Sequence, residues 1–259
     1  PYYCVIGGWV IKYLMVYLSG NGASAAADDY FSSFIGSPVS PIIFTAVFIF
    51  LTAVVVLLGV QKGIEKVSKI LMPVLIIISV GIAFYSLTLD GAWEGFLYYI
   101  KPNFADFSIK TVVAAMGQLF YSMSLAMGIM ITYGSYMRRE DNLEGSVRQI
   151  EIFDTAVAFL SGMMIVPAVY AFSGGDKEAL NQGAGLMFVT LPKVFSTMYG
   201  GKIVGAVFFI LVLLAALTSA ISLMETIVSI FSDKLKVKRW VICVGVMIIS
   251  AAVAVPSSL

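Results

Sequence analysis

The sequence predicts an all-α integral membrane protein, and three observations lead to that fold class. Of its 259 residues, 60% are hydrophobic and 12% are charged, whereas soluble domains usually carry about 25% charged residues. The mean hydropathy is +0.97. Apolar runs recur along the whole chain, with the length of about 20 residues that a helix needs to cross a bilayer core. Membrane lipid is therefore the expected surrounding of a single transmembrane domain over residues 1–259.

Composition also excludes several classes of function. The net charge is +1, so no basic surface points to nucleic acid, and the chain contains no histidine. A Ser-His-Asp triad and a histidine-ligated metal are excluded, so we expect neither an enzyme nor an organic cofactor. Cys4 and Cys243 lie in apolar runs and are expected to be free thiols. Because the sequence begins at Pro1 within an apolar run, without a basic leader, we interpret it as a fragment.

Seven membrane helices are expected from the apolar runs. They cover residues 1–19, 41–60, 69–89, 111–137, 150–172, 202–231 and 240–257. The second and the last of these runs hold no charged residue. The first holds one lysine, Lys12, which can keep its charge in the interface by snorkelling along its aliphatic stem.

The connections between these runs fall into two classes. Three short links, 61–69, 138–149 and 232–239, carry three, three and four of the sixteen lysines and arginines. Because cytoplasmic loops collect positive charge, we expect these links on the inner side of the plasma membrane. The longer connections would then lie outside. One of them, 173–201, is expected to form two short helices, either as a lid over a central cavity or as a structural cap.

The fourth run, 111–137, is longer than a membrane crossing requires. Its 27 residues would make a helix of about 40 Å. Its polar and small residues include Gln118, Tyr121, Ser122, Ser124 and Gly128. Such residues can mediate ordinary helix packing, but these do not fall on one stripe. A helix broken near 123–128 would instead turn freed backbone groups toward a cavity that holds ions or a polar ligand.

The fifth run, 150–172, holds a candidate acidic residue near its start. Asp154 lies within "IEIFDTAVAFLSG", and an ionisable residue inside a membrane is a candidate functional residue by default. The alternative is a structural ion pair with a basic loop residue such as Arg148. Glu225, near the inner end of the sixth run, is a similar candidate.

The sixth run, 202–231, carries a polar face. Ala215, Thr218, Ser219 and Ser222 follow one another at i, i+3, i+4 and i+7, which places them on one side of a helix. Two adjacent hydroxyls beside a carbonyl form the oxygen-rich environment that hard cations prefer. The alternative is that these hydroxyls bond back to carbonyls of their own helix.

Several motifs together resemble the neurotransmitter:sodium symporters, in particular the bacterial amino-acid branch with the LeuT-type fold. "YYCVIGGW" resembles the third transmembrane helix, "GQLFYSMSLAMG" the unwound sixth, and "DTAVAFLSGMMIVPAV" the seventh. "GAGLMFVTLP" resembles the outer lid and "LAALTSAISLME" the eighth helix. The resemblance implies an inverted-repeat transporter fold with an unwound central helix, of which this chain covers helices three to nine.

The resemblance also implies site residues. Ser122 and Asp154 would ligate a first sodium ion, and Ala215, Thr218 and Ser219 a second. Tyr3 would bond the carboxylate of an amino-acid substrate, and Tyr121 would close over it. The remaining residues implied in the substrate pocket are Ile6, Met123, Ser124, Met127, Ser219 and Leu223. Gln118 would join a polar network above the site.

The sequence departs from the family at Tyr121, which often has a Phe counterpart, and at Ala126 and Met127. These departures leave the identity of the amino acid open. Gly63 and Pro73 are separated by nine residues, a spacing that related bacterial transporters use as a hinge to unwind the fifth helix.

The expected function is sodium-coupled import of an amino acid by alternating access, with Na⁺ as the transported ion. The alternative is a channel or a non-transporting amino-acid receptor on the same scaffold. A channel needs a continuous polar path, whereas the bulky lining expected here favours an occluded pocket.

Overall fold

The computed structural model describes residues 2–105, 107–176, 180 and 183–258. Over these ranges every regular element is helical, which confirms the all-α fold class. The long helices are α1 (Tyr2–Leu18), α3 (Ser40–Leu57), α4 (Lys66–Leu87), α8 (Leu143–Phe172), α11 (Gly201–Lys234) and α12 (Arg239–Ser258). The shorter helices are α2 (Tyr30–Ile35), α5 (Ala92–Ile100), α6 (Ile109–Ser122), α7 (Ile129–Tyr136), α9 (Gly183–Gly185) and α10 (Leu191–Thr197).

Five helices of the described chain are long and apolar enough to cross a membrane. They are Ser40–Leu57, Gly63–Leu87, Leu143–Phe172, Gly201–Lys234 and Arg239–Ser257. Tyr2–Leu18 is apolar but shorter. The expected run at 111–137 is divided between α6 and α7, and α8 begins at Leu143 rather than at residue 150. The number of membrane crossings stays a prediction.

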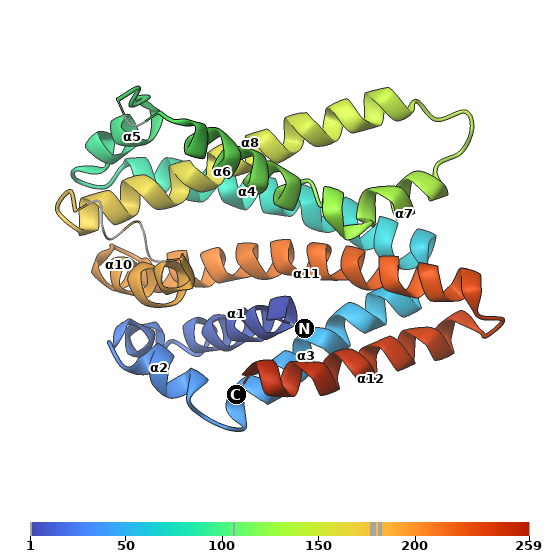
Figure 1. Ribbon diagram of the computed structural model, residues 1–259. Coiled ribbons are helices and arrows are strands. Elements are labelled where there is room, and N and C mark those ends of the chain that lie inside the picture. The colour runs from blue at the N-terminus through green and yellow to red at the C-terminus, as the bar shows by residue number, and fades with distance from the viewer. Residues whose placement is uncertain (1, 106, 177–179, 181–182, 259) are drawn as a thin grey trace.

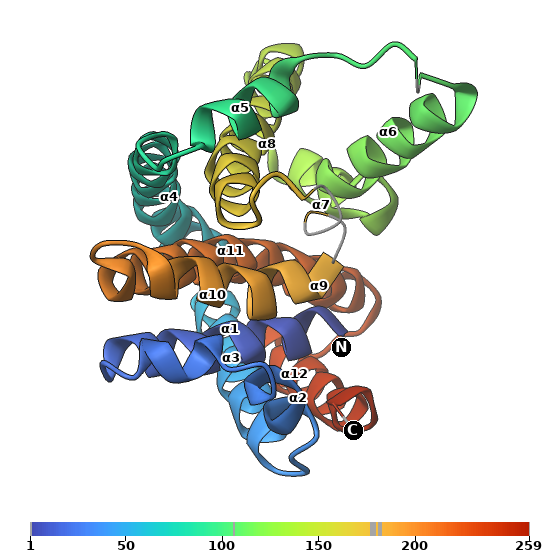
Figure 2. The ribbon, with the colours of Figure 1, turned by 90° about the vertical axis from the view of Figure 1, so that its left-hand side faces the viewer.

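The long helices run between two ends of the molecule, with α11 through the middle (Figure 1), but they are not parallel, since α1 and α11 lie across the view in Figure 2 whereas α4 and α8 are seen nearly end-on. This helix packs against α1, α3, α4 and α12. One end of the molecule, here called the loop end, carries α2, α5 and α10 (Figure 1). The opposite end, the basic end, carries the links 137–142 and 235–238 (Figure 1).

The core at the loop end is aromatic. Tyr13 of α1 is fully buried, and its ring lies 5.2 Å from both Phe188 and Phe209. Its hydroxyl donates to the carbonyl of Phe188 at 2.8 Å. Phe188 belongs to the π-helical turn η5 (Leu186–Thr190), which precedes α10. Aromatic packing together with this hydrogen bond therefore attaches the segment before α10 to the scaffold.

A glycine permits the close packing of α1 on α3. A Cβ atom at Gly8 would lie 2.6 Å from the backbone nitrogen of Thr45. Any larger residue at this position would force the two helices apart, so the contact depends on the missing side chain.

The fourth apolar run is broken where its polar residues gather. Helix α6 ends at Ser122, and the short turn η3 (Leu125–Met127) separates it from α7. Ser124 has φ 55° and Gly128 has φ 74°. The left-handed conformation costs a residue other than glycine about 1–2 kcal/mol, so Ser124 is held there by its surroundings. The prediction of an unwound central helix is confirmed.

A second irregular segment precedes α4. The π-helical turn η2 (Val60–Glu65) leads into α4, and Pro73 lies inside that helix. A Cβ atom at Gly63 would lie 2.2 Å from the carbonyl oxygen of Val55. Only glycine therefore fits in this turn. The two predicted hinge residues therefore flank an irregular helix start, although their role as a hinge stays a prediction.

Candidate ion and substrate site

The broken segment faces α8 through one polar contact. Ser122, the last residue of α6, donates its hydroxyl hydrogen bond to Oδ2 of Asp154 at 2.9 Å. No ion pair joins Asp154 to Arg148, both of which lie in the described part of the chain. The structure thus brings together the two residues predicted for the first sodium ion. Ligation of sodium by them stays a prediction.

The polar face of α11 is arranged around its own carbonyls. Thr218 Oγ1 donates to the carbonyl of Ala215 at 3.0 Å, and Ser222 Oγ donates to the carbonyl of Thr218 at 3.1 Å. This is the back-bonding that the sequence left open as an alternative. It also places the Thr218 hydroxyl beside the Ala215 carbonyl. If the Thr218 hydroxyl turned its hydrogen away from the Ala215 carbonyl, a cation could contact the hydroxyl oxygen and the carbonyl oxygen at once.

The residues predicted to hold the substrate backbone converge from three helices. Tyr3 of α1 lies near Ser219 of α11 and near Tyr121 of α6, close enough for both side chains to interact electrostatically with its hydroxyl. Tyr121 is 58% exposed, so its face is open in the described chain.

The other predicted pocket residues are spread over the same elements. Ile6 lies in α1 and Leu223 in α11, both partly buried. Met123, Ser124 and Met127 lie in or beside the break between α6 and α7. Gln118 lies on α6, none of whose residues is buried. Figure 2 shows α6 standing apart from the packed helices, so the network predicted around Gln118 has no enclosing wall among the described residues.

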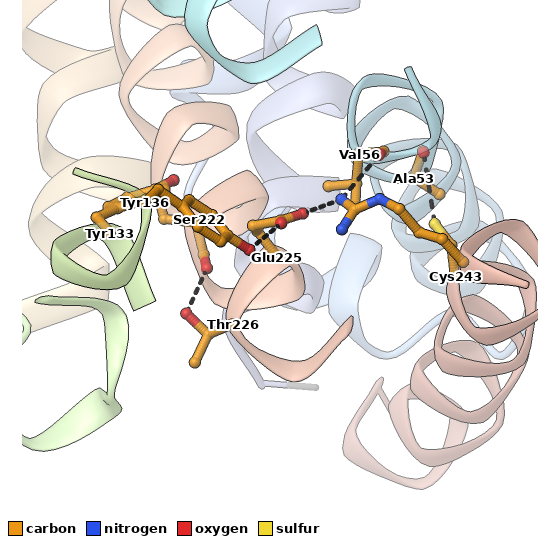
Figure 3. A network of polar contacts seen from close by, with 9 residues as sticks. Ala53, Val56, Tyr133, Tyr136, Ser222, Glu225, Thr226 and Cys243 are labelled. Carbon is orange, nitrogen blue, oxygen red and sulfur yellow. Dashed lines mark hydrogen bonds and ion pairs between the residues drawn. The ribbon is translucent and has the colours of Figure 1, made fainter. Parts of the chain in front are cut away.

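A buried ionic network at the basic end was only partly anticipated. Glu225 of α11 has an exposed fraction of 0%. It accepts a hydrogen bond from the Tyr136 hydroxyl of α7 at 2.7 Å and pairs with Arg239 of α12. Arg239 also donates to the carbonyl of Val56 in α3 at 3.3 Å. The network therefore joins four helices (Figure 3).

Sequence reasoning singled out Glu225 but gave it no partner. One signal was present: Tyr133 and Tyr136 have the same three-residue spacing as Ser222 and Glu225. Equal spacing on two helices allows two contacts one turn apart. The position of Arg239 at the first turn of α12 was a second signal, because it begins the helix that follows α11.

The outer connection 173–201 is described from residue 183 onward and at 173–176 and 180. Gly183 and Gly185 lie in α9, which continues through η5 into α10. Lys193 of α10 pairs with Asp28. The hydrogen bond and charge of Lys193 hold the pKa of the Asp28 carboxyl below its ordinary value of 3.8. The pair is therefore ionised at neutral pH, and its contribution is lost only as the pH falls through that lowered pKa.

Comparison with known proteins adds to this geometry. Residues 31–257 match the model of the sodium:neurotransmitter symporter family. The uncharacterized sodium-dependent transporter YhdH of Bacillus subtilis is 37% identical over 231 residues, which are 88% of this chain and 50% of the relative. An uncharacterized sodium-dependent transporter of Haemophilus influenzae is 36% identical over 245 residues, which are 92% and 53% of the two chains.

A solved structure is also similar. The crystal structure of MhsT in complex with L-phenylalanine matches with a TM-score of 0.87 and 39% sequence identity. The match covers 100% of this chain and 58% of the MhsT chain. The chain thus spans about half the length of the curated relatives that it matches.

Proposed function

The chain belongs to the sodium:neurotransmitter symporter family, and from that premise we propose that it acts in the sodium-coupled uptake of an amino acid. The family is one of sodium-dependent symporters rather than enzymes. One observation supports the proposal above the others: a membrane helix is broken beside the Ser122–Asp154 contact. Irregular backbone at membrane depth is tolerated where it lines a protected cavity, and ions and substrates bind at such breaks.

Two groups of oxygens would hold sodium. The Asp154 carboxylate and Ser122 hydroxyl would form the first site, in which a full negative charge offsets the cost of dehydrating the ion. The Ala215 carbonyl with the Thr218 and Ser219 hydroxyls would form the second, which is neutral. Sodium moving inward would release about 2.3 kcal/mol per charge for each 100 mV of membrane potential. This free energy would drive accumulation of the substrate.

The amino acid would lie between these groups. Tyr3 would donate to its carboxylate, and the unpaired backbone groups of the break would meet its charged ends. Tyr121 would cover it, while Ile6, Met123, Met127 and Leu223 would surround its side chain with apolar atoms. Ser124 would contribute through its backbone. The relative MhsT was crystallised with L-phenylalanine, which supports an amino acid as the class of substrate.

The proposed setting is the plasma membrane, with the basic end in the cytoplasm. The connection 173–201 would then face outside as a lid. Its attachments through Phe188 and the Asp28–Lys193 pair support a position over the loop end of α1 and α11.

Uptake into proteoliposomes tests the proposal against a channel or a receptor. With an inward sodium gradient, radiolabelled amino acids should accumulate above their external concentration, and replacement of sodium by choline should abolish this. A channel would only equilibrate the amino acid, and a receptor would bind it without uptake. The Asp154→Asn variant should still fold, but its uptake should need a higher sodium concentration to reach half its maximum. Equal accumulation in choline would refute sodium coupling.

A further inference from the structure

Two hydroxyl contacts connect α7 to α11 on the side of the proposed second sodium site that faces the basic end. The Tyr133 hydroxyl lies 2.7 Å from Ser222 Oγ, and the Tyr136 hydroxyl lies 2.7 Å from Glu225 Oε1 (Figure 3). The residues of the second contact follow those of the first by three positions on each helix. The two contacts therefore lie about one helical turn apart and form consecutive rungs between α7 and α11. The second rung belongs to the ionic network. The first rung joins two uncharged hydroxyls and lies outside that network.

The direction of the first rung follows from counting protons. A serine hydroxyl has one proton to donate. Ser222 gives its proton to the carbonyl of Thr218, which lies 3.1 Å away. Ser222 Oγ is therefore the acceptor in the contact with Tyr133, and the tyrosine hydroxyl is the donor. The result is a directed chain from Tyr133 through Ser222 to the backbone of Thr218.

This chain ends at residues of the proposed second sodium site. The carbonyl that accepts from Ser222 belongs to Thr218, whose own hydroxyl donates to Ala215 at 3.0 Å. Hydrogen bonds in series polarise and strengthen one another. Serine and threonine back-bonds also bend the helix turn that carries them. The Tyr133 bond thus acts on the conformation of the turn that presents the Ala215 and Thr218 oxygens.

We propose that Tyr133 and Ser222 are positioning residues for the second sodium site, an inference that depends on the proposed function. Neither residue would touch the ion. Ser222 would hold the Thr218 turn in its cation-binding geometry, and Tyr133 would do so only while α7 rests against α11. Because α7 starts directly after the break, at Ile129, the same helix would connect the first site to the second.

The test is a double-mutant cycle with Tyr133→Phe and Ser222→Ala in the full transporter. The readout is the dissociation constant for sodium, fitted to the rise in Tm over a sodium series without substrate, since the stabilisation grows as RT ln(1 + [Na⁺]/Kd). Each variant should raise it roughly fivefold, the equivalent of about 1 kcal/mol for one buried hydrogen bond. The double variant should be no worse than either single variant, because both remove the same chain. Ser222→Thr, which keeps the hydroxyl, should restore the wild-type value.

A matched control removes a similar hydroxyl elsewhere. Ser79 of α4 is 1% exposed and donates to the carbonyl of Leu75 at 2.8 Å, as Ser222 does to Thr218. Ser79→Ala should change Tm without changing the sodium dependence. A change equal to that of Ser222→Ala would mean that the effect is general loss of stability, which would overturn the proposal.

A further variant separates this inference from the sodium site itself. Thr218→Val removes a proposed ligand and should shift the sodium dependence more than Tyr133→Phe does. If Thr218→Val shifts it while Tyr133→Phe and Ser222→Ala do not, the positioning role is wrong and the site stands. Additive effects of the pair would also refute the shared chain. If Thr218→Val has no effect, the second site itself is wrong, and the inference falls with it.

Discussion

Thr218 and Ser219 are adjacent hydroxyl residues whose side chains have different partners. Thr218 donates to the carbonyl of Ala215 within α11, whereas the Ser219 side chain lies near the Tyr3 hydroxyl of α1. In the proposed function the first contact would keep two oxygens together for sodium, and the second would connect the same helix turn to the substrate position. One pair of neighbours can therefore serve both sodium and the amino acid.

Removing both hydroxyls tests the second sodium site by function. The variant Thr218→Val with Ser219→Ala should raise the sodium concentration for half-maximal uptake by at least tenfold, since each lost oxygen of a desolvated ion is worth about 1 kcal/mol or more. Uptake would be measured over a sodium series at fixed substrate. A variant with unchanged sodium dependence would contradict the assignment.

Asp154 predicts that uptake needs no chloride. A sodium ion in a low-dielectric site needs a negative charge beside it, which either an added anion or a fixed carboxylate can supply. Here a carboxylate already bonds Ser122 at that position, and Ala158 one turn later offers no hydroxyl. Replacing chloride by gluconate on both sides at constant sodium should leave uptake unchanged. A collapse toward background would show that Asp154 does not supply the charge.

The Glu225–Arg239 pair predicts that substitutions of these two residues have strongly coupled effects on the free energy of unfolding. Glu225 is fully buried, so Arg239→Gln leaves a charge without its counter-ion, a change that costs about 3–5 kcal/mol in buried pairs. Adding Glu225→Gln removes that charge and should recover most of the loss. Thermal unfolding in detergent measures both variants. Losses that simply add would mean that the two side chains do not depend on each other.

At the scale of elements, the sequence predicted the broken helix but not the ionic network. The break was predictable because polar residues that cannot share one face of a helix mark a place where the helix cannot continue in lipid. The matched spacing of Tyr133 and Tyr136 with Ser222 and Glu225 allowed these contacts but could not establish them, because Tyr136 lies 89 residues from Glu225 in the chain. Such a contact depends on how α7 and α11 pack, which the local pattern does not encode.

Helix boundaries show the same limit. Helix α8 begins at Leu143, where the Asn142 side chain accepts a hydrogen bond from the backbone N–H of Gly145 at 3.0 Å. This cap starts the helix in polar sequence, before the apolar run begins. Hydropathy reports where a helix can lie in lipid, whereas capping decides where it starts.

The irregular start of α4 carries a prediction about release. Proline has no N–H for the helix and weakens the turn before it. Pro73→Ala should therefore strengthen α4, slow release of substrate to the inside and leave equilibrium binding nearly intact. Binding and uptake would be measured side by side. Equal losses in both would indicate misfolding, and full retention of both would exclude the hinge.

At the scale of the whole molecule, the packed and the open regions differ in role. The helices α1, α3, α11 and α12 form a closely packed group, held together by small residues and buried aromatics. Helix α6 stands apart with no buried residue (Figure 2). The first proposed site lies between α6 and α8, at the Ser122–Asp154 contact, and the second lies along α11, against which α7 packs. Movement of α6 and α7 against the packed group would therefore change both sites together.

Coupling between sodium and the amino acid is tested most directly by reversing the gradient. Proteoliposomes loaded with sodium and labelled amino acid are diluted into sodium-free medium that contains a higher concentration of the same labelled amino acid, and the net flux is compared with the net flux in medium of equal sodium. An outward sodium gradient should drive the amino acid out against its own concentration gradient, and dissipating the sodium gradient with an ionophore should stop this movement. Net flux that always follows the amino-acid gradient, whatever the direction of the sodium gradient, would contradict sodium-coupled transport.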